Sequence, residues 1–269
     1  MKNMQRTIRR YAKIYGVLLR LNWATLFAYR ASMISSIISH TAWATFIIVS
    51  MLLLTSKTSS VFGWTRNELL ILAGMYNVVY SVFYFLFSRN FNEFVNLIHF
   101  GRLDAILTKP IDSQFLISCT IVSYTHIIRF FIGVGFLIFV LSQMHAVITP
   151  ILIIICALLV VLSVLIIYSF WFLVMTLTLW FTKLSNLMDL LYEIKGITKF
   201  PQEVYKGASI YLLVALFPLT LVVVVPAKAL LQKMLLGDVV WPLFFAVVMF
   251  VAARKFWQYA LRSYTSASG

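Results

Sequence analysis

Long apolar runs alternate with shorter polar stretches along the whole chain. The runs cover 31–54, 69–87, 115–141, 151–181, 208–227 and 239–260. A helix needs about 20 mainly apolar residues to cross a bilayer, so we predict six membrane-spanning helices. The last run continues past Arg254 and Lys255, whose long side chains can reach the interface. The pattern predicts an all-α membrane protein, with one transmembrane domain over residues 1–269.

The stretch before the first run, residues 1–30, has the pattern of an amphipathic helix. At helical spacing its basic residues fall on one arc: Lys2, Arg6, Arg9, Arg10, Lys13 and Arg20. Apolar and aromatic residues fall on the opposite arc: Met4, Ile8, Tyr11, Tyr15 and Leu18. We expect a helix that lies on the membrane surface. A cleavable signal peptide is not expected, because the following apolar run is too long for one.

The amino-acid composition supports a membrane protein, and the placement of the basic residues explains its positive net charge. The chain is 62% hydrophobic and 11% charged, with a mean hydropathy of +0.96, which excludes an ordinary soluble domain. With the N-terminus inside, the inside segments hold 17 Lys and Arg and the outside segments hold 4. The net charge of +14 therefore follows the positive-inside rule, and we expect both termini in the cytoplasm, anionic lipid as the neighbour and no nucleic-acid partner.

A polar insertion, 88–117, separates the second and third runs. It contains the sequence GRLDAILTKP, in which Gly101, Leu103, Asp104, Leu107 and Pro110 form a spaced pattern. Helical spacing groups the apolar residues Phe91, Phe94, Val95, Ile98, Leu103 and Leu107. The charged residues of this stretch include Glu93, Arg102, Asp104, Lys109 and Asp112. We interpret it as a cytoplasmic helix that docks in a groove of a soluble subunit; the alternative is a solvated loop with weak surface ion pairs.

Two further stretches depart from simple spans. Residues 182–207 predict an inside loop with an amphipathic helix, ended by Gly196 and Pro201, whose shared face comprises Leu184, Leu187, Met188, Leu191 and Tyr192. Pro218 and Pro226 interrupt the fifth run. Because proline removes a backbone donor and kinks a helix, we predict a break near Pro218, followed by a short re-entrant helix that ends near Gly237.

Ionisable residues within spans are candidates for a functional site, because they are costly in lipid. They are His40 in the first span, and His126 and Arg129 in the third. His126 and Arg129 are three residues apart and share a helix face. One interpretation is a translocation pathway with a polar site for an anionic headgroup. The other is hydrogen bonding between helices, with Arg129 reaching toward the interface.

Other chemistry is poorly supported by the residues. The four histidines are scattered, and neither a metal-binding motif nor a phosphate-binding P-loop occurs. We therefore expect no metal, no cofactor bound by this chain and no nucleotide hydrolysis by it. Asp189 and Glu193 are the only acid pair at helical spacing. A lipid-modifying enzyme built on them, or a scaffold or assembly protein without transport, remains an alternative to a transport subunit.

The basic N-terminal helix, the six spans, the segment Gly101–Pro110 (GRLDAILTKP) and the segment Phe217–Leu231 (FPLTLVVVVPAKALL) together resemble the permease subunits of bacterial ABC-2-type transporters. The resemblance covers essentially the whole chain. It implies a pore formed with a second permease subunit, identical or different. Two cytoplasmic ATPases would bind the ATP and Mg²⁺ and drive the transport.

The resemblance also implies roles for particular segments. The loop with Gly101–Pro110 would hold the coupling helix that docks on the ATPase, and residues 1–30 would form an elbow helix. The residues implied at the coupling interface are Glu93, Gly101, Arg102, Leu103, Asp104, Leu107, Lys109 and Pro110, with Leu103 and Leu107 as its apolar contacts. The segment after Pro218 would be re-entrant. Such permeases are expected in the bacterial cytoplasmic membrane and mostly export polysaccharides, lipids, drugs or peptides; the residues do not name the cargo.

Overall fold

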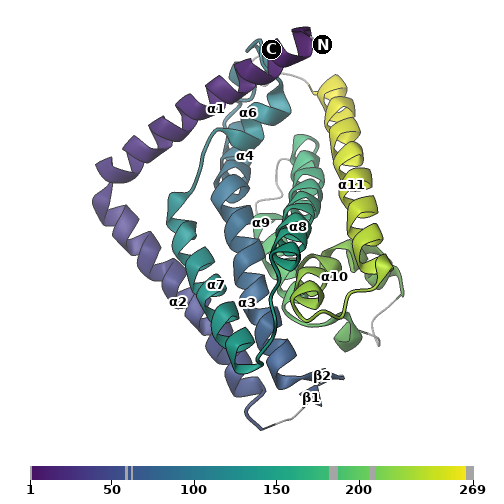
Figure 1. The fold of residues 1–269 in the computed structure, drawn as a ribbon. Helices are drawn as coiled ribbons and strands as arrows, with labels where there is room; N and C mark the ends of the chain where they lie inside the picture. Colours follow the sequence, from purple (N-terminus) through teal and green to yellow (C-terminus); the bar gives the residue numbers. More distant parts are fainter. Residues whose placement is uncertain (1, 58–59, 62, 182–186, 206–209, 265–269) are drawn as a thin grey trace.

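The chain folds into a helical bundle with one small hairpin of two strands (Figure 1). The computed structural model describes residues 2–57, 60–61, 63–181, 187–205 and 210–264, with side chains outside 2–5, 202 and 210–217. The strands pair antiparallel, with Ser60 opposite Thr65. The elements in chain order are α1 (Lys2–Ala28), α2 (Arg30–Leu54), β1 (Ser60–Val61), β2 (Trp64–Thr65), α3 (Arg66–Phe83), the π-helix η1 (Tyr84–Ser88), α4 (Arg89–His99), α5 (Asp104–Leu107), α6 (Ser113–Cys119), η2 (Tyr124–His126), α7 (Ile127–Gln143), α8 (Pro150–Thr176), η3 (Leu177–Leu179), α9 (Leu187–Ile194), η4 (Lys195–Lys199), η5 (Gln202–Tyr205), α10 (Ile210–Leu230) and α11 (Leu236–Ser263).

Two opposite ends of the bundle are useful landmarks. The α5 end holds the start of α1, the helices α4 to α6 and the last turns of α11, and the hairpin end holds β1 and β2 (Figure 1). Within the described residues, five helical runs are long and apolar enough to cross a membrane: 30–54, 66–99, 124–143, 150–179 and 236–263. Large apolar side chains such as Phe46, Phe131 and Phe244 are exposed on their outer faces, as expected for contact with lipid.

Helices α1 and α2 form the two arms of an open V that partly encloses the other helices (Figure 1). The α1 arm crosses α6 and the residues after it. The ring of Tyr11 packs edge-on against Phe115, with centroids 4.9 Å apart. Asn22 Nδ2 donates a hydrogen bond to the carbonyl oxygen of Thr120 at 2.9 Å. The helix predicted for the N-terminal stretch is therefore present, and it is tied to the bundle by polar and aromatic contacts.

The predicted third span, 115–141, is not one helix. The chain leaves α6 after Cys119 and re-enters helical structure at Tyr124. Asn90 of α4 replaces the lost backbone partners, since it accepts a hydrogen bond from Ile121 N at 2.8 Å and donates one to Ile121 O at 2.6 Å. The backbone N–H of Ser123 donates to Phe85 O, in the π-helical turn, at 2.9 Å. This break is stable inside the bundle because its polar backbone groups are satisfied.

Helix α7 packs closely on α3 because two glycines face each other. A Cβ atom on Gly133 would lie 3.1 Å from Gly74 O and 3.0 Å from Asn77 Cβ. A Cβ atom on Gly74 would lie 2.8 Å from the Leu137 side chain. Small residues let helix backbones approach in membrane proteins. The close contact brings Arg129, one turn before Gly133, against α3.

The segment 187–205 runs along α3 in the opposite direction. Its successive partners lie progressively nearer the hairpin end: Lys195 Nζ donates to Tyr84 Oη at 2.7 Å, Thr198 Oγ1 to Tyr80 Oη at 3.0 Å, and Glu203 Oε2 accepts from Trp64 Nε1 at 3.2 Å. At about 1.5 Å per helical residue, the path from Tyr84 to Trp64 is about 30 Å, similar to the roughly 30 Å thickness of a bilayer core.

The prediction that 182–207 is a loop at one end of the molecule is therefore wrong. Its helix is shorter than predicted, ending at Ile194, and 3₁₀ turns continue the chain. The predicted apolar face is partly confirmed, because Leu187, Met188 and Leu191 are buried, whereas Leu184 lies outside the described residues. Hydropathy alone failed here because charged residues of the segment are held by neighbouring aromatic hydroxyl and indole groups.

The predicted breaks at Pro218 and Pro226 are also wrong. Helix α10 continues through both prolines and ends at Leu230. The chain turns at Gln232, where φ is +55°, and Gly237 already belongs to the first turn of α11. Every residue from 218 to 227 is buried, and α10 packs mainly on α8. Surrounding protein can compensate for the backbone bonds that proline removes, which explains why the helix persists.

Candidate functional sites: the α5 tip and a cationic cavity

The GRLDAILTKP segment begins with a well-formed helix end. The N–H of Gly101 donates to Ile98 O at 3.1 Å, and the N–H of Arg102 donates to Leu97 O at 2.8 Å. These are the two bonds of a Schellman motif, which places its glycine in the left-handed region. Gly101 has φ +64°, where a side chain would cost free energy. The glycine thus turns the chain sharply from α4 into α5.

The apolar face predicted to dock on another protein is covered by this chain itself. Phe91, Phe94 and Leu103 are fully buried. The ring of Phe94 lies 6.4 Å from that of Phe172 on α8 and 5.7 Å from that of Trp257 on α11. Leu103 is therefore not available as an apolar contact for a partner, which corrects the prediction. The sequence pattern indicated correctly that these residues need apolar neighbours, but the neighbours lie in α8 and α11.

What remains exposed at the α5 tip is a small mixed surface. Phe100 is 62% exposed, and the guanidinium carbon of Arg102 lies 5.0 Å from the centre of its ring. Lys109 and Pro110 are also exposed. Sequence reasoning missed Phe100, which lies outside the apolar stripe of α4. The sequence did contain a signal for it. Phe100 directly precedes the turn-forming Gly101 and does not share the helical spacing of the buried residues of α4, so its side chain was to be expected on the surface.

The other predicted tip residues lie around this surface. Leu107 and Asp104 are half-buried. The carboxylate of Asp104 lies near the end of α11, where burial and this charge raise the pKa of Tyr264. Glu93 lies on α4 and accepts a hydrogen bond from Asn96 Nδ2 at 3.4 Å. The predicted residues are thus brought together at one end, but they differ in access to solvent.

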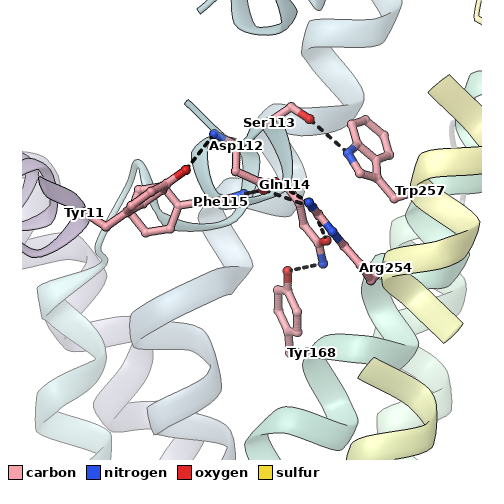
Figure 2. Close-up of polar contacts among 8 residues, drawn as sticks. All are labelled: Tyr11, Asp112, Ser113, Gln114, Phe115, Tyr168, Arg254 and Trp257. Atoms are coloured by element: carbon pink, nitrogen blue, oxygen red, sulfur yellow. Dashed lines mark hydrogen bonds and ion pairs between the residues drawn. The ribbon is translucent and has the colours of Figure 1, made fainter. Parts of the chain in front are cut away.

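Directly behind the tip, Asp112 caps α6 and receives Arg254 from α11 (Figure 2). Arg254 Nη1 donates to Asp112 Oδ1 and to Gln114 Oε1, both at 3.0 Å, and Nη2 pairs with Asp112 Oδ2. Gln114 Nε2 in turn donates to the hydroxyl of Tyr168 on α8 at 3.1 Å. Arg254, whose side chain was expected to reach toward the interface, is held by a bidentate ion pair at this end of the bundle.

Two more contacts extend this network, which we name the clasp (Figure 2). The N–H of Asp112 donates to Tyr11 Oη on α1 at 3.0 Å. Trp257 Nε1 on α11 donates to Ser113 Oγ at 3.1 Å. The start of α6 is therefore fixed to α1, α8 and α11 at once. We define the clasp as Tyr11, Asp112, Ser113, Gln114, Tyr168, Arg254 and Trp257.

Electrostatics favour the ionised clasp. Burial alone would raise the pKa of Asp112, but the Arg254 guanidinium and the N–H of Phe115 outweigh it and hold this pKa below its usual value. The side chains of Arg254 and Asp112 remain 36% and 30% exposed, so water still screens the pair. The carboxylate is consequently charged throughout the neutral range, and the clasp stays closed there.

A separate polar cavity of about 1080 Å³ lies between the α1–α2 arms and the rest of the bundle. Its walls come from α1, α2, η1, α4, the break before α7, and the α9–η4 segment. Among the described residues that line it, three are Lys or Arg and none is Asp or Glu. The cationic and imidazole groups are Arg89, Arg129, Lys195, His40 and His126. Both histidines and Arg129 were singled out from the sequence, and the structure brings all three to this cavity.

Arg129 is the most buried of these cations, with 3% exposure. Its Nε donates to Asn77 Oδ1 at 2.9 Å, and its guanidinium carbon lies 5.4 Å from the ring centre of Tyr76 and 5.7 Å from that of Tyr84. Its Nη2 is buried and makes no hydrogen bond within the described part of the chain. A buried charge normally has an ionic partner, so Arg129 is an exception that calls for a physical reason.

Lys195 and the histidines complete this wall. Lys195 Nζ lies 4.7 Å from the ring centre of Tyr192 and donates to the neutral hydroxyl of Tyr84. The imidazoles of His40 and His126 stack with centroids 3.8 Å apart, and His40 Nε2 lies 3.2 Å from Thr125 Oγ1. Sequence reasoning missed Lys195, because it assigned this residue to a cytoplasmic loop.

The alternative enzymatic site receives no comparable support from the arrangement of its residues. Asp189 and Glu193 are both exposed on α9. In the described ranges, no three residues of the His, Cys, Asp or Glu types cluster as metal ligands would. Cys119 and Cys156 are free thiols on α6 and α8.

Comparison with known proteins agrees with an assignment to transport. The model of the ABC-2 family transporter protein family matches residues 41–268, which is most of the chain and includes the α5 tip, every clasp residue except Tyr11, and most of the cavity walls. No curated protein and no solved structure matches this chain. The apolar helices are those of a multi-pass membrane protein, and the chain belongs to the ABC-2 transporter family, as a permease component of an ABC transporter.

Proposed function

We propose that this chain is the transmembrane subunit of an ABC exporter, paired with a second permease subunit and driven by two cytoplasmic ATPases that bind at the α5 tip. The observation that supports this most directly is the clasp. An exposed tip that is tied by hydrogen bonds to α1, α8 and α11 can transmit a push to helices that line the bundle. ATP and Mg²⁺ belong to the ATPases in this proposal, and the chain binds no cofactor itself.

In the proposed topology the α5 end faces the cytoplasm of a bacterial cell, with both termini on that side. Basic residues favour this orientation, because Arg6, Arg9, Arg10, Arg102 and Lys109 all belong to this end. The chain would cross the membrane six times, in α2, α3–α4, α7, α8, the segment 187–205 and α11. The run 208–227, which was predicted as the fifth span, corresponds to α10 and would not be a crossing in this topology, because the residues before and after it, Glu203 and Lys233, both bond to the hairpin end. The course of 187–205 along α3 supports its place as the fifth crossing.

The ATPase would contact Phe100, Arg102, Lys109 and Pro110. The exposed ring of Phe100 offers the apolar anchor, and the two cations form a charged rim. Aromatic and arginine side chains commonly contribute most of the binding free energy at protein interfaces. A partner surface with an apolar pocket edged by carboxylates would be complementary. Closure of the ATPase pair would press on α5, and the clasp would pass the motion to α1 and α11.

The test is co-purification from native membranes in mild detergent, followed by measurement of ATPase activity in vesicles. We expect a P-loop ATPase to co-purify with the wild-type chain. Phe100→Ala and Arg102→Ala should each weaken this association about tenfold, because each removes part of a small contact surface. Phe139→Ala is the matched control, since Phe139 is similarly exposed, at 56%, but lies on α7 away from the tip.

A chain that carries no ATPase even after crosslinking would refute the transport subunit and favour the scaffold interpretation. ATPase association that survives both tip substitutions would preserve the transporter but move the contact surface elsewhere. The same sample also reports the permease partner, because a second chain in the complex indicates a heterodimer and its lack indicates two copies of this chain.

A further inference from the structure

We infer that the cationic cavity binds the anionic head of an amphiphile that enters from the membrane, with Arg129 and Lys195 as the anion contacts. The inferred ligand is the cargo class of the proposed transporter. Binding of the ligand does not depend on the proposed function, whereas its role as cargo rests on it. The chemistry required of the ligand is a phosphate or similar compact anion attached to an apolar chain.

The cavity lining is positively charged. The described residues around this cavity include Arg89, Arg129 and Lys195 but no acid. All three ion pairs of the described chain lie elsewhere: Lys228–Asp238, Lys233–Glu68 and Arg254–Asp112. Among the described residues, the cavity cations therefore form no ion pair, although the Glu193 carboxylate on the neighbouring turn of α9 acts on Lys195 from outside the lining. Burying a cation without a counter-charge is costly, and a bound anion would remove that cost.

Arg129 is held in a fixed orientation at the cavity wall. Asn77 and the rings of Tyr76 and Tyr84 hold the guanidinium in place through its Nε atom and its faces. Within the described residues, the buried Nη2 makes no hydrogen bond of normal geometry, and the Tyr76 hydroxyl beside the guanidinium is also left without one. A guanidinium that is fixed through Nε and has an unpaired Nη2 next to a cavity keeps N–H donors for the phosphate or carboxylate oxygens that arginine commonly binds. The start of α7 also faces this cavity, and its dipole adds positive potential.

The shape of the cavity favours an amphiphile over a free ion. Its volume of about 1080 Å³ is far larger than a single phosphate requires. On the α1–α2 side it is lined by Leu26, Tyr29 and Met33, near the junction of the two arms, whereas Arg129 and Lys195 belong to other walls. An apolar chain could pass this junction toward lipid while its head reaches the cations. Trp43 and Tyr192 would pack beside the head.

The experiment uses the purified full chain in neutral detergent without any ATPase. Dioctanoyl phosphatidylglycerol is the anionic probe, dioctanoyl phosphatidylcholine is the zwitterionic control, and inorganic phosphate is the free anion. Binding is followed by the rise in Tm with ligand concentration and by the fluorescence of Trp43, which is identified by the Trp43→Phe variant. We expect saturable binding of the anionic lipid, at least tenfold tighter than that of either other probe.

Arg129→Met and Lys195→Gln should each weaken binding of the anionic lipid at least tenfold. Lys195→Gln is an independent test of the same site on another wall, at a residue that is only half-buried. Arg262→Gln is the control, since Arg262 is exposed at the end of α11, and should leave binding unchanged. Equal affinity for anionic and zwitterionic lipids, or unchanged binding in both cavity variants, would overturn the site.

Phosphate that binds as tightly as the lipid would overturn the amphiphile and leave a free-anion site. These results are independent of ATPase partnership, because no ATPase is present. A chain that binds the lipid but never associates with an ATPase would refute the proposed transporter and keep the cavity. A chain that associates with an ATPase but ignores the lipid would do the reverse.

Discussion

The clasp and the cavity both place arginine away from bulk water, but they treat its charge in opposite ways. Arg254 in the clasp meets a carboxylate and an amide oxygen. Arg129 in the cavity meets one amide oxygen and two aromatic faces, and its Nη2 remains without a partner in the described chain. The difference shows that the described residues satisfy the clasp but leave a donor of Arg129 unpaired in the cavity, which is where the inferred anion would bind.

The largest expected effect on stability follows from opening the clasp. Arg254→Met removes the guanidinium from the Asp112 carboxylate and the Gln114 amide oxygen, and leaves Asp112 with only the N–H donors of its own helix. We expect a loss of about 2 kcal/mol in unfolding free energy, less than the 3–5 kcal/mol of a fully buried pair, because water partly screens this one. The measurement is the Tm of the purified chain in detergent. Lys255→Met is the control, since the neighbouring Lys255 is exposed, and should change the Tm little.

A smaller effect on stability is expected for Arg129→Met. It removes one hydrogen bond to Asn77 but also removes a buried cation that lacks an ionic partner. The two effects oppose each other, so the ligand-free unfolding free energy should change by less than about 1 kcal/mol. The Tm of the two arginine variants, measured side by side without lipid, gives the comparison. A loss at Arg129 as large as that at Arg254 would mean that both arginines are structural.

The smallest effect is a pH dependence confined to the clasp. The folded pKa of Asp112 lies below its usual value, so its contribution to stability is fully present above the unfolded pKa of about 4. That contribution is lost as the pH falls below about 4 and through the folded pKa. Asp112→Asn should remove this part of the acid dependence of the Tm. An Asp112→Asn variant with the same acid profile as wild type would show that the clasp carboxylate does not titrate as inferred.

Much of the fold could be predicted because membrane-spanning helices appear in the sequence as long apolar runs. The helical N-terminus and the five long apolar helices follow from local patterns, whereas the turn at Gly101 interrupts the helical spacing predicted from Phe91 to Leu107. His126 and Arg129 were found because ionisable residues in apolar runs are conspicuous. These features depend on neighbours within one or two helical turns, which the sequence displays directly.

The rest depends on partners that are distant in the sequence. Arg254 finds Asp112 142 positions away, and Glu203 finds Trp64 139 positions away. Lys195 seemed to belong to a solvated loop, since nothing near it in sequence reveals the Tyr84 hydroxyl. The proline prediction failed for a related reason, because the burial of α10 cannot be read from its own residues. Phe100 was missed because a contact surface is defined by the solvent exposure of its side chains, and the exposure of Phe100 depends on the packing of α4.

The segment 187–205 has a consequence for how the protein is made. It carries five charged residues, Asp189, Glu193, Lys195, Lys199 and Glu203, and its short helices leave backbone groups that lipid cannot satisfy. On the proposed topology, the insertion machinery would not release such a segment alone into the bilayer. Its partners Tyr84, Tyr80 and Trp64 are all synthesised earlier. The segment would therefore enter the membrane only by packing against α3, after α3 has been inserted.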